Sequence, residues 1–152
     1  MDWGIGTPVL DYAGDGRNDI VFGSGHHYGL FVLRQQPLGV TPRWLSHPID
    51  TSWSQAHTLI LADIEGNGRP VVVTGKRYKA HDTDPGVDDP LGLFYYRFDR
   101  ATKRPRKFVI DSGTRVRTGL HLTAVDLRRT ERLDLIAPGK SGLYLFENEG
   151  HR

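Results

Sequence analysis

The feature that most constrains this chain is an internal repeat. A short apolar segment, an Asp, a polar turn and a second apolar segment ending near Gly recur three times, at residues 8–23, 59–75 and 122–139. Repetition of this kind is typical of architectures in which each unit buries its apolar faces only against its neighbours. The repeat therefore predicts three similar units packed side by side.

A further segment, Gly-Leu followed by aromatic and aliphatic residues, comes after each copy. It lies at residues 29–33, 92–96 and 142–146, and a fourth apolar segment follows the first two copies, at 43–49 and 107–111. Such residues favour the pleated, half-buried surface of a sheet. Each unit is thus predicted to be an antiparallel meander, with four strands in the first two units and three in the last.

Helix is the main alternative in the third copy, because good helix formers fill the segment from Leu122 to Ile136. The same place in the first two copies holds Gly-Asp-Gly and Gly-Asn-Gly turns, which argue against a helix. We therefore expect an all-β chain that forms a single repeat domain over residues 1–152, with units at about 4–50, 55–112 and 118–150.

Composition excludes several classes of function. The chain has no cysteine, which rules out disulfide frameworks, thiol catalysis and zinc–thiolate sites. Its 20 basic and 18 acidic residues nearly cancel, so no nucleic-acid partner is indicated. No stretch has the length of a transmembrane helix, so no membrane insertion is expected. The N-terminus lacks the features of a secretion signal, which leaves an intracellular protein or a piece of a longer secreted one.

The loop between the first two predicted strands carries the most specific motif. Residues 11–19 read Asp-Tyr-Ala-Gly-Asp-Gly-Arg-Asn-Asp. Alternate carboxylates on a tight turn provide the hard oxygen ligands that suit Ca²⁺, and the glycines allow the positive φ of such a turn. This nonapeptide resembles the Asp-x-Asp/Asn-Gly-Asp-Gly-x-x-Asp loop of the FG-GAP (VCBS-type) repeat family, and the repeat period covers nearly the whole chain. The resemblance implies three antiparallel blades of a β-propeller and calcium in this loop.

Within this resemblance the calcium ligands are assigned position by position. In the first loop they are the side chains of Asp11, Asp15 and Asp19 with the Arg17 carbonyl. Ala13 replaces a further ligand of the family, so affinity for calcium is expected to be reduced. Turns stabilised by Asx-type hydrogen bonds without metal are the alternative interpretation.

The second and third loops match the calcium motif less well. The matching residues are Asp63, Glu65 and Asn67 in the second loop and Asp126 and Asp134 in the third. Val71 replaces the closing Asp of the second loop, and Arg128 and Arg129 bring positive charge to the third. The second loop therefore remains an alternative calcium site, and the third is not expected to bind the ion.

The other end of the units is predicted to bind a ligand. In a meander, the second-to-third connections and the links between units lie opposite the Asp-Gly turns, and loops held by a rigid scaffold often carry function. Five of the seven histidines map to this face, together with aromatic and basic residues. The expected ligand-binding residues are His26, His27, Tyr28, Trp53, His57, Arg77, Tyr78, His81, Arg115, Arg117 and His121.

Taken singly, each of these residues can be explained without a ligand. A His or Arg in a loop is usually only solvated, and His57 or His121 could pack in a central channel. Together they suit a polyol or an anionic sugar, since aromatic rings stack on sugar rings and Arg pairs with carboxylates. The long acidic insertion at 80–90 lies on the same face. There His81 with Asp82 or Asp84 could ligate a divalent metal, although a solvated turn is the favoured interpretation.

Two classes of function follow from the resemblance. FG-GAP-type propellers include lectins and adhesion-receptor heads, which implies a binding module for carbohydrate or a protein partner, with structural calcium, at the cell surface or outside the cell. Others are sugar dehydratases or lyases, for which His57, His121 and Tyr78 are the candidate acid/base residues. A His within reach of a Tyr or Lys in a deep pocket favours the enzyme, and a shallow rim favours the binding module.

Three blades fall short of the roughly four to eight that close a propeller. The outer units would leave apolar faces uncovered, which soluble monomers rarely tolerate. We therefore expect either a homodimer that forms a six-bladed ring or further blades in the remainder of a longer chain.

Overall fold

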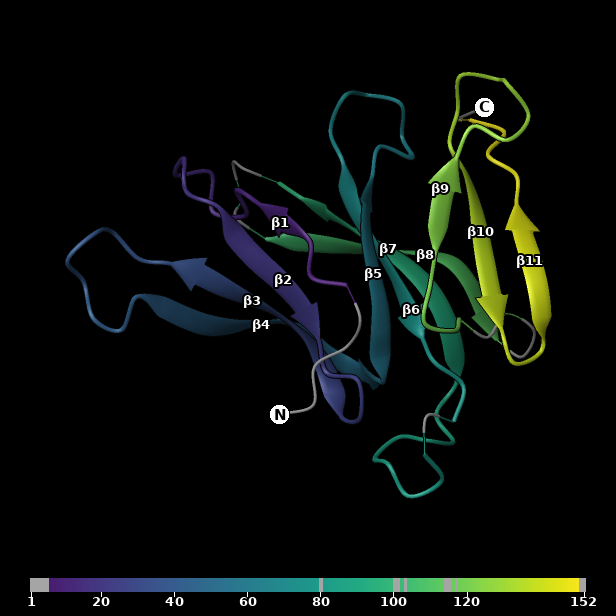
Figure 1. The fold of residues 1–152 in the computed structure, drawn as a ribbon, viewed down its shortest axis with the longest axis horizontal. Helices are drawn as coiled ribbons and strands as arrows, with labels where there is room; N and C mark the ends of the chain where they lie inside the picture. Colours follow the sequence, from purple (N-terminus) through teal and green to yellow (C-terminus); the bar gives the residue numbers. More distant parts are fainter. Residues whose placement is uncertain are drawn as a thin grey trace.

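The computed structural model describes residues 6–79, 81–99, 102, 104–113, 116 and 118–150, and within these residues it contains strands and no helix (Figure 1). The strands form three antiparallel sheets, with four, four and three strands. This confirms the predicted all-β class and the strand content of each unit. The alternative of a helix between Leu122 and Ile136 is excluded, because strands β9 and β10 lie there.

Each sheet is a simple meander in which strands adjacent in sequence are hydrogen-bonded neighbours. The first sheet contains β1 (Val9–Leu10), β2 (Asp19–Gly23), β3 (Tyr28–Gln35) and β4 (Trp44–Ser54). The second contains β5 (Ala56–Ala62), β6 (Val71–Lys76), β7 (Leu91–Phe98) and β8 (Pro105–Gly113). The third contains β9 (Thr123–Val125), β10 (Asp134–Gly139) and β11 (Gly142–Phe146). The central strands pair in matching register, with Val21 opposite Val32, Val73 opposite Tyr95 and Ala137 opposite Tyr144.

The second sheet lies between the other two and is buried on both faces (Figure 1). Successive side chains of a strand point to opposite faces of the sheet. Val72 of β6 accordingly packs in the cluster shared with the first sheet, while Val71 and Val73 pack in the cluster shared with the third. Large apolar side chains remain exposed in the outer sheets, including Trp44, Leu45, Leu143 and Leu145.

The link between the first two sheets differs from the prediction. The first two units were expected at about 4–50 and 55–112, with a connection between them. The chain there is instead the end of β4 and the start of β5, separated by Gln55 alone. Gln55 has a φ of 60°, which turns the chain from one sheet into the next. Its backbone is held on both sides, because its N–H donates to the His27 carbonyl at 2.9 Å and its carbonyl accepts from the Arg77 N–H at 3.0 Å.

Glycine allows the sheets to approach closely at two equivalent places. A Cβ added at Gly23 would lie 2.2 Å from the Ala56 carbonyl oxygen, and one at Gly75 would lie 2.5 Å from Thr118 Cγ2. These glycines end the second apolar segment of the first and second repeat. The repeated Gly is therefore a packing requirement, because a side chain would clash with β5 at Gly23 and with Thr118, in the link before β9, at Gly75.

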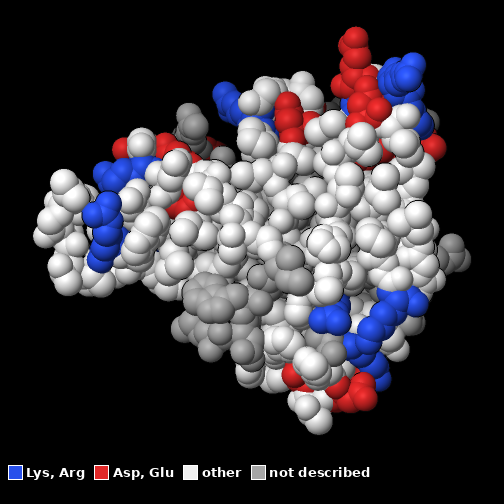
Figure 2. Space-filling view, in the orientation of Figure 1, with Lys and Arg blue, Asp and Glu red and all other residues white. Residues whose placement is uncertain are grey.

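The two ends of the molecule carry different connections. In Figure 1 the loops that follow β5 and β9 project from the upper edge, and the connection at residues 77–90, between β6 and β7, projects from the lower edge. Figure 2 shows charged residues of both signs at the upper and lower edges, and also at the left, over the first sheet. The meander thus separates the Asp-Gly turns from the histidine-bearing connections, as the strand order predicts.

Candidate functional site

Three histidine rings and one carboxylate meet at the end opposite the Asp-Gly turns. His26 comes from the β2–β3 loop, His57 from β5, and His81 and Asp84 from the 77–90 connection. The His26 ring lies 5.2 Å from that of His57, edge to face, and 4.8 Å from that of His81, stacked. His26 Nδ1 lies 2.8 Å from Asp84 Oδ2, and this hydrogen bond lowers the pKa of the Asp84 carboxyl. We call these four residues the histidine cluster.

His57 is the buried member of the cluster, with 5% of its surface exposed. It packs on the backbone of Gly25, where an added Cβ would lie 3.1 Å from His57 Cε1. Burial, with the positive charge of Arg77, lowers the pKa of His57 to about 4, so the ring is neutral at neutral pH. Arg77 Nη1 lies 3.4 Å from His57 Nε2, and because a guanidinium only donates, Nε2 is the acceptor nitrogen.

Lys76 fixes the 77–90 connection from inside. Its side chain is fully buried, and Nζ donates to the Gly86 carbonyl at 2.6 Å and to Ser54 Oγ at 2.8 Å. Burial lowers the pKa of this amine. Ser54 Oγ also donates to the Gly86 carbonyl, at 3.1 Å. The connection that carries His81 and Asp84 is thereby tied to the end of β4 and β6. Sequence reasoning did not single out Lys76 for this role, because only the fold shows that it is buried.

A second contact joins the first sheet to the same connection. The Tyr28 hydroxyl donates to Asp89 Oδ2 at 2.5 Å, and this hydrogen bond raises the pKa of Tyr28. Lys79 pairs with Asp88 at 3.4 Å and lies 6.0 Å from the centre of the Tyr78 ring. Tyr78 itself is half-buried.

The remaining residues expected at this face comprise one core residue, two exposed residues and two that lie outside the described part. Trp53 belongs to the core between the first two sheets, where its Nε1 donates to the Tyr96 hydroxyl at 2.8 Å. His27 and His121 are exposed. Arg115 and Arg117 lie outside the described residues. The structure therefore joins His26, His57, Arg77 and His81 and assigns Trp53 a structural position.

The Asp-Gly turns share one hydrogen-bond pattern. In each, the carboxylate of the first Asp accepts two backbone N–H groups, from the residues four and five positions later. The donors are Asp15 and Gly16 to Asp11 at 3.0 Å each, Asn67 and Gly68 to Asp63 at 3.1 and 2.7 Å, and Thr130 and Glu131 to Asp126 at 2.8 and 2.9 Å. The repeated Asp is therefore the residue that shapes the turn.

The other predicted calcium ligands are also engaged by protein donors. Asp15 lies 2.5 Å from Arg17 Nη2, and Asp19 accepts the N–H groups of Ala13 and Gln35. In the second loop, Glu65 pairs with Arg97 and accepts a hydrogen bond from Asn67 at 3.2 Å. The carboxylates of Asp11, Asp15 and Asp19 do not form a group with ligand atoms within 4.8 Å of one another. This arrangement does not fit a calcium ion as it stands, and calcium in the first two loops stays a prediction.

The described residues contain one group whose geometry suits a metal. Ligand atoms of His26, His81 and Asp84 all lie within 4.8 Å of one another. His26 and Asp84 are partly buried and His81 is exposed, so one side of the group is open to solvent. Two imidazoles and a carboxylate form a donor set that suits divalent transition metals rather than Ca²⁺.

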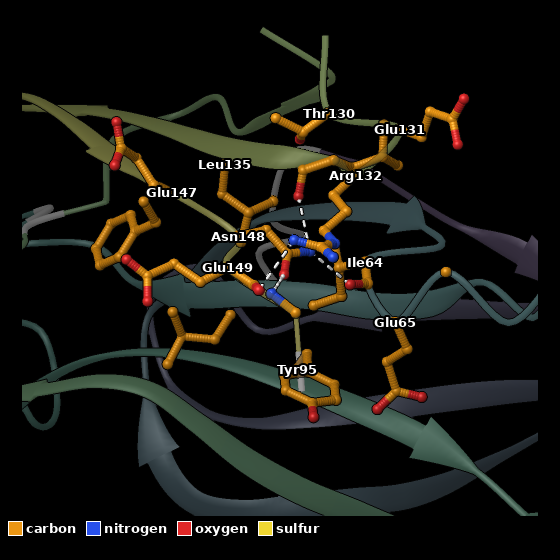
Figure 3. Close-up of a pocket in the computed structure, with 15 residues that line it drawn as sticks. Ile64, Glu65, Tyr95, Thr130, Glu131, Arg132, Leu135, Glu147, Asn148 and Glu149 are labelled. Carbon is orange, nitrogen blue, oxygen red and sulfur yellow. Dashed lines mark hydrogen bonds between the residues drawn. The ribbon is translucent and has the colours of Figure 1, made fainter. Parts of the chain in front are cut away.

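A cavity of about 510 Å³ lies at the opposite end, between the second and third sheets (Figure 3). Arg132 and Asn148 lie at the centre of its lining, with Tyr95 across from them. Asn148 Nδ2 donates to the carbonyls of Ile64 and Leu133, and Arg132 Nη1 donates to that of Glu149. These hydrogen bonds hold the C-terminal segment in place. The cavity shares no lining residue with the histidine cluster.

A scan against protein-family models finds no match, and a search of curated proteins finds none. Within the described residues, no helix is long and apolar enough to cross a membrane. The geometry of the histidine cluster is therefore the observation that bears on function.

Proposed function

We propose that this chain is a carbohydrate-binding module of the β-propeller type, and that the histidine cluster with Arg77 is its ligand site. The observation that carries the proposal is the convergence of His26, His57 and His81 from three separate segments. The cluster forms where sheets meet, on connections anchored by buried contacts. Such preorganised polar groups at a junction between packed elements are typical of binding sites.

The chemistry of the site favours an anionic sugar. Arg77 supplies a permanent positive charge and a planar set of donors that match a carboxylate. His81 and Asp84 offer hydrogen-bond partners to hydroxyl groups, and the partly exposed Tyr78 ring provides an apolar face for a sugar ring. A protein partner with an acidic side chain is the alternative ligand.

A sugar dehydratase or lyase is the second candidate. In such an enzyme neutral His57 would be the general base, and Arg77 beside it would bind the anionic group of the sugar. Two observations weaken it. His57 is almost fully buried and its low pKa makes it a weak base, whereas general bases work best with a pKa near the operating pH. His26 and His57 pair with Asp84 and Arg77, while the enzyme prediction required a Tyr or Lys partner in a deep pocket.

The ligand site is tested with a glycan array that contains neutral and uronic-acid sugars, followed by calorimetry. We expect uronates to bind, and the Arg77→Gln variant to bind them about 10- to 100-fold more weakly, the loss typical of a hydrogen bond to a charged group. Arg69→Gln is the matched control, because Arg69 is exposed in the second Asp-Gly turn. Equal affinity in both variants would contradict the proposed site, and turnover of a bound sugar would favour the enzyme.

Propeller closure belongs to the same proposal. The buried middle sheet and the two equivalent glycine contacts support units that pack as propeller blades. The exposed apolar side chains of the outer sheets support closure by a second copy of this chain into a six-bladed ring, or by further blades of a longer chain. Light scattering is expected to give a discrete dimer near twice 17.1 kDa for the ring. A stable monomer at high concentration would contradict it.

A further inference from the structure

We propose that His26, His81 and Asp84 bind one divalent transition-metal ion, for which zinc is the best-fitting metal. The role of this ion in ligand binding rests on the proposed function, but its binding to the protein is a separate property. The metal would sit at the open side of the histidine cluster and complete the site for a sugar hydroxyl or carboxylate.

The distances require only a small rearrangement. Zinc binds imidazole nitrogen and carboxylate oxygen at about 2.0–2.2 Å, so two ligand atoms on a tetrahedral ion lie roughly 3.3 Å apart. His26 Nδ1 and Asp84 Oδ2 are 2.8 Å apart, with a proton between them. The ion would replace this proton and separate the two atoms by about half an ångström. All three ligand atoms already lie within 4.8 Å of one another, so rotation of exposed His81 can bring its nitrogen to the ion.

The connection that carries Asp84 is acidic. Residues 77–90 contain four aspartates, Asp82, Asp84, Asp88 and Asp89, and two permanent cations, Arg77 and Lys79. Lys79 pairs with Asp88, whereas Arg77 lies on His57, next to the proposed ligand His26. Among the described residues, the ion-pair partner of Asp84 is His26, and no Lys or Arg pairs with this carboxylate.

Surrounding contacts hold two of the ligands in position. The His57 ring packs edge-on against His26, and the buried Lys76 and Ser54 both bind the Gly86 carbonyl. These contacts fix the β2–β3 loop relative to the connection that carries Asp84. Outer contacts of this kind orient metal ligands and contribute to metal affinity.

The donor set determines the class of metal and leaves room for a ligand. Two imidazole nitrogens with one carboxylate suit zinc and its neighbours in the first transition row, whereas Ca²⁺ takes six to eight oxygens. Three protein ligands leave at least one coordination position, as in zinc sites that bind water or substrate. That position would accept an oxygen of the same anionic sugar that Arg77 attracts.

The test uses the full chain without a histidine tag, stripped of metal with a chelator. Calorimetry with Zn²⁺ and visible absorption with Co²⁺ report binding directly. We expect one equivalent of either ion, and at least tenfold weaker binding for the His81→Ala and Asp84→Asn variants, a loss that even outer-shell changes can cause. His47→Ala is the matched control, since His47 is an exposed histidine on β4 and is expected to leave binding unchanged.

The possible outcomes test metal binding and carbohydrate binding independently of each other. No stoichiometric binding by the unmodified chain, or equal binding by the ligand variants and the unmodified chain, would overturn the metal site. Displacement of Zn²⁺ by an equal concentration of Ca²⁺ would overturn the choice of metal. A uronate that binds equally well with and without Zn²⁺ would overturn the role of the ion in the ligand site while leaving the proposed function intact. Stoichiometric zinc without any sugar binding would uphold the metal site and contradict the proposed function.

Discussion

The two ends of the molecule use aspartate in different ways. At the turn end, Asp11, Asp63 and Asp126 each accept two N–H groups from their own loop. At the histidine end, Asp84 and Asp89 accept hydrogen bonds from His26 and Tyr28, side chains of a different segment. The repeated aspartates build the local fold in every unit. Asp19 and Asp134 of the turn end also reach another segment, but there they accept the backbone N–H groups of Gln35 and Asn148. Asp84 and Asp89 instead bind side chains from the first sheet and its β2–β3 loop, and this makes their end the better candidate for function.

The largest effect is expected for Asp19→Ala at the turn end. Asp19 is 1% exposed, and its carboxylate accepts the Gln35 N–H at 2.8 Å and the Ala13 N–H at 3.1 Å. Its removal leaves two N–H groups without their acceptor, so we expect a loss of about 3 kcal/mol in the free energy of unfolding. Urea denaturation measures this loss.

Asp15→Ala is the control for Asp19→Ala, because Asp15 is exposed and its pair with Arg17 is a surface ion pair. A change within about 1 kcal/mol is expected for it. If both variants lose the same free energy of unfolding, the burial of Asp19 does not explain its contribution to stability. Calcium titration of the unmodified chain and Asp15→Ala tests the ligand prediction as well. Loss of one calcium site in the variant would support that prediction, and binding to neither protein would contradict it.

The sequence predicted the fold well where a pattern is repeated. Three copies of the same segment located the strands around each Asp-Gly turn, and the turn glycines correctly excluded a helix in the third unit. It missed the extension of β4 to Ser54, because Pro48, Asp50 and Ser52 have the composition of a loop. Burial of Trp53 against Phe94 and its hydrogen bond to Tyr96 stabilise this extended segment, and such long-range contacts leave no local pattern.

The candidate site was predictable only in part. The meander placed the β2–β3 and β6–β7 connections at one end, which brought His26, Arg77 and His81 into the predicted set. The pairing of His26 with Asp84 depends on the course of a long insertion that no repeat constrains. Trp53 was predicted to bind ligand, because the sequence alone does not distinguish an aromatic residue at a binding surface from one in the core.

A second prediction concerns Lys76, which ties the 77–90 connection to the sheets. Lys76→Met removes the donor to the Gly86 carbonyl and Ser54 Oγ but also relieves the burial of an amine. We therefore expect a moderate loss of about 1–2 kcal/mol in the free energy of unfolding. Hydrogen exchange should become faster in residues 81–90, whereas Arg69→Met, in an exposed turn at the other end, should leave exchange there unchanged. Unchanged protection in Lys76→Met would show that other contacts hold the connection.

A third prediction uses pH to test the turn end. Hydrogen bonds from the Arg128 guanidinium and the Asn148 N–H lower the pKa of Asp134 to about 2. Because the pKa is lower in the folded state, the stabilisation is fully present above the unfolded pKa of about 4 and is lost as the pH falls through about 2. Thermal unfolding between pH 5 and pH 2 should show this loss, and Asp134→Asn should reduce the dependence on pH. An identical pH profile in the variant would assign acid sensitivity to other carboxylates.

The smallest effect on stability is expected at the histidine end, where Asp84→Asn and His81→Ala should each change the free energy of unfolding by less than about 0.5 kcal/mol. His81 is exposed, and Asp84 belongs to a connection that Lys76 and Tyr28 hold at other points. A side chain that contributes to binding but little to folding has this profile. Urea denaturation of the metal-free variants measures the effect without any contribution from a bound ion. A loss of 2 kcal/mol or more in either variant would place these residues with the structural aspartates, and the difference between the two ends would then disappear.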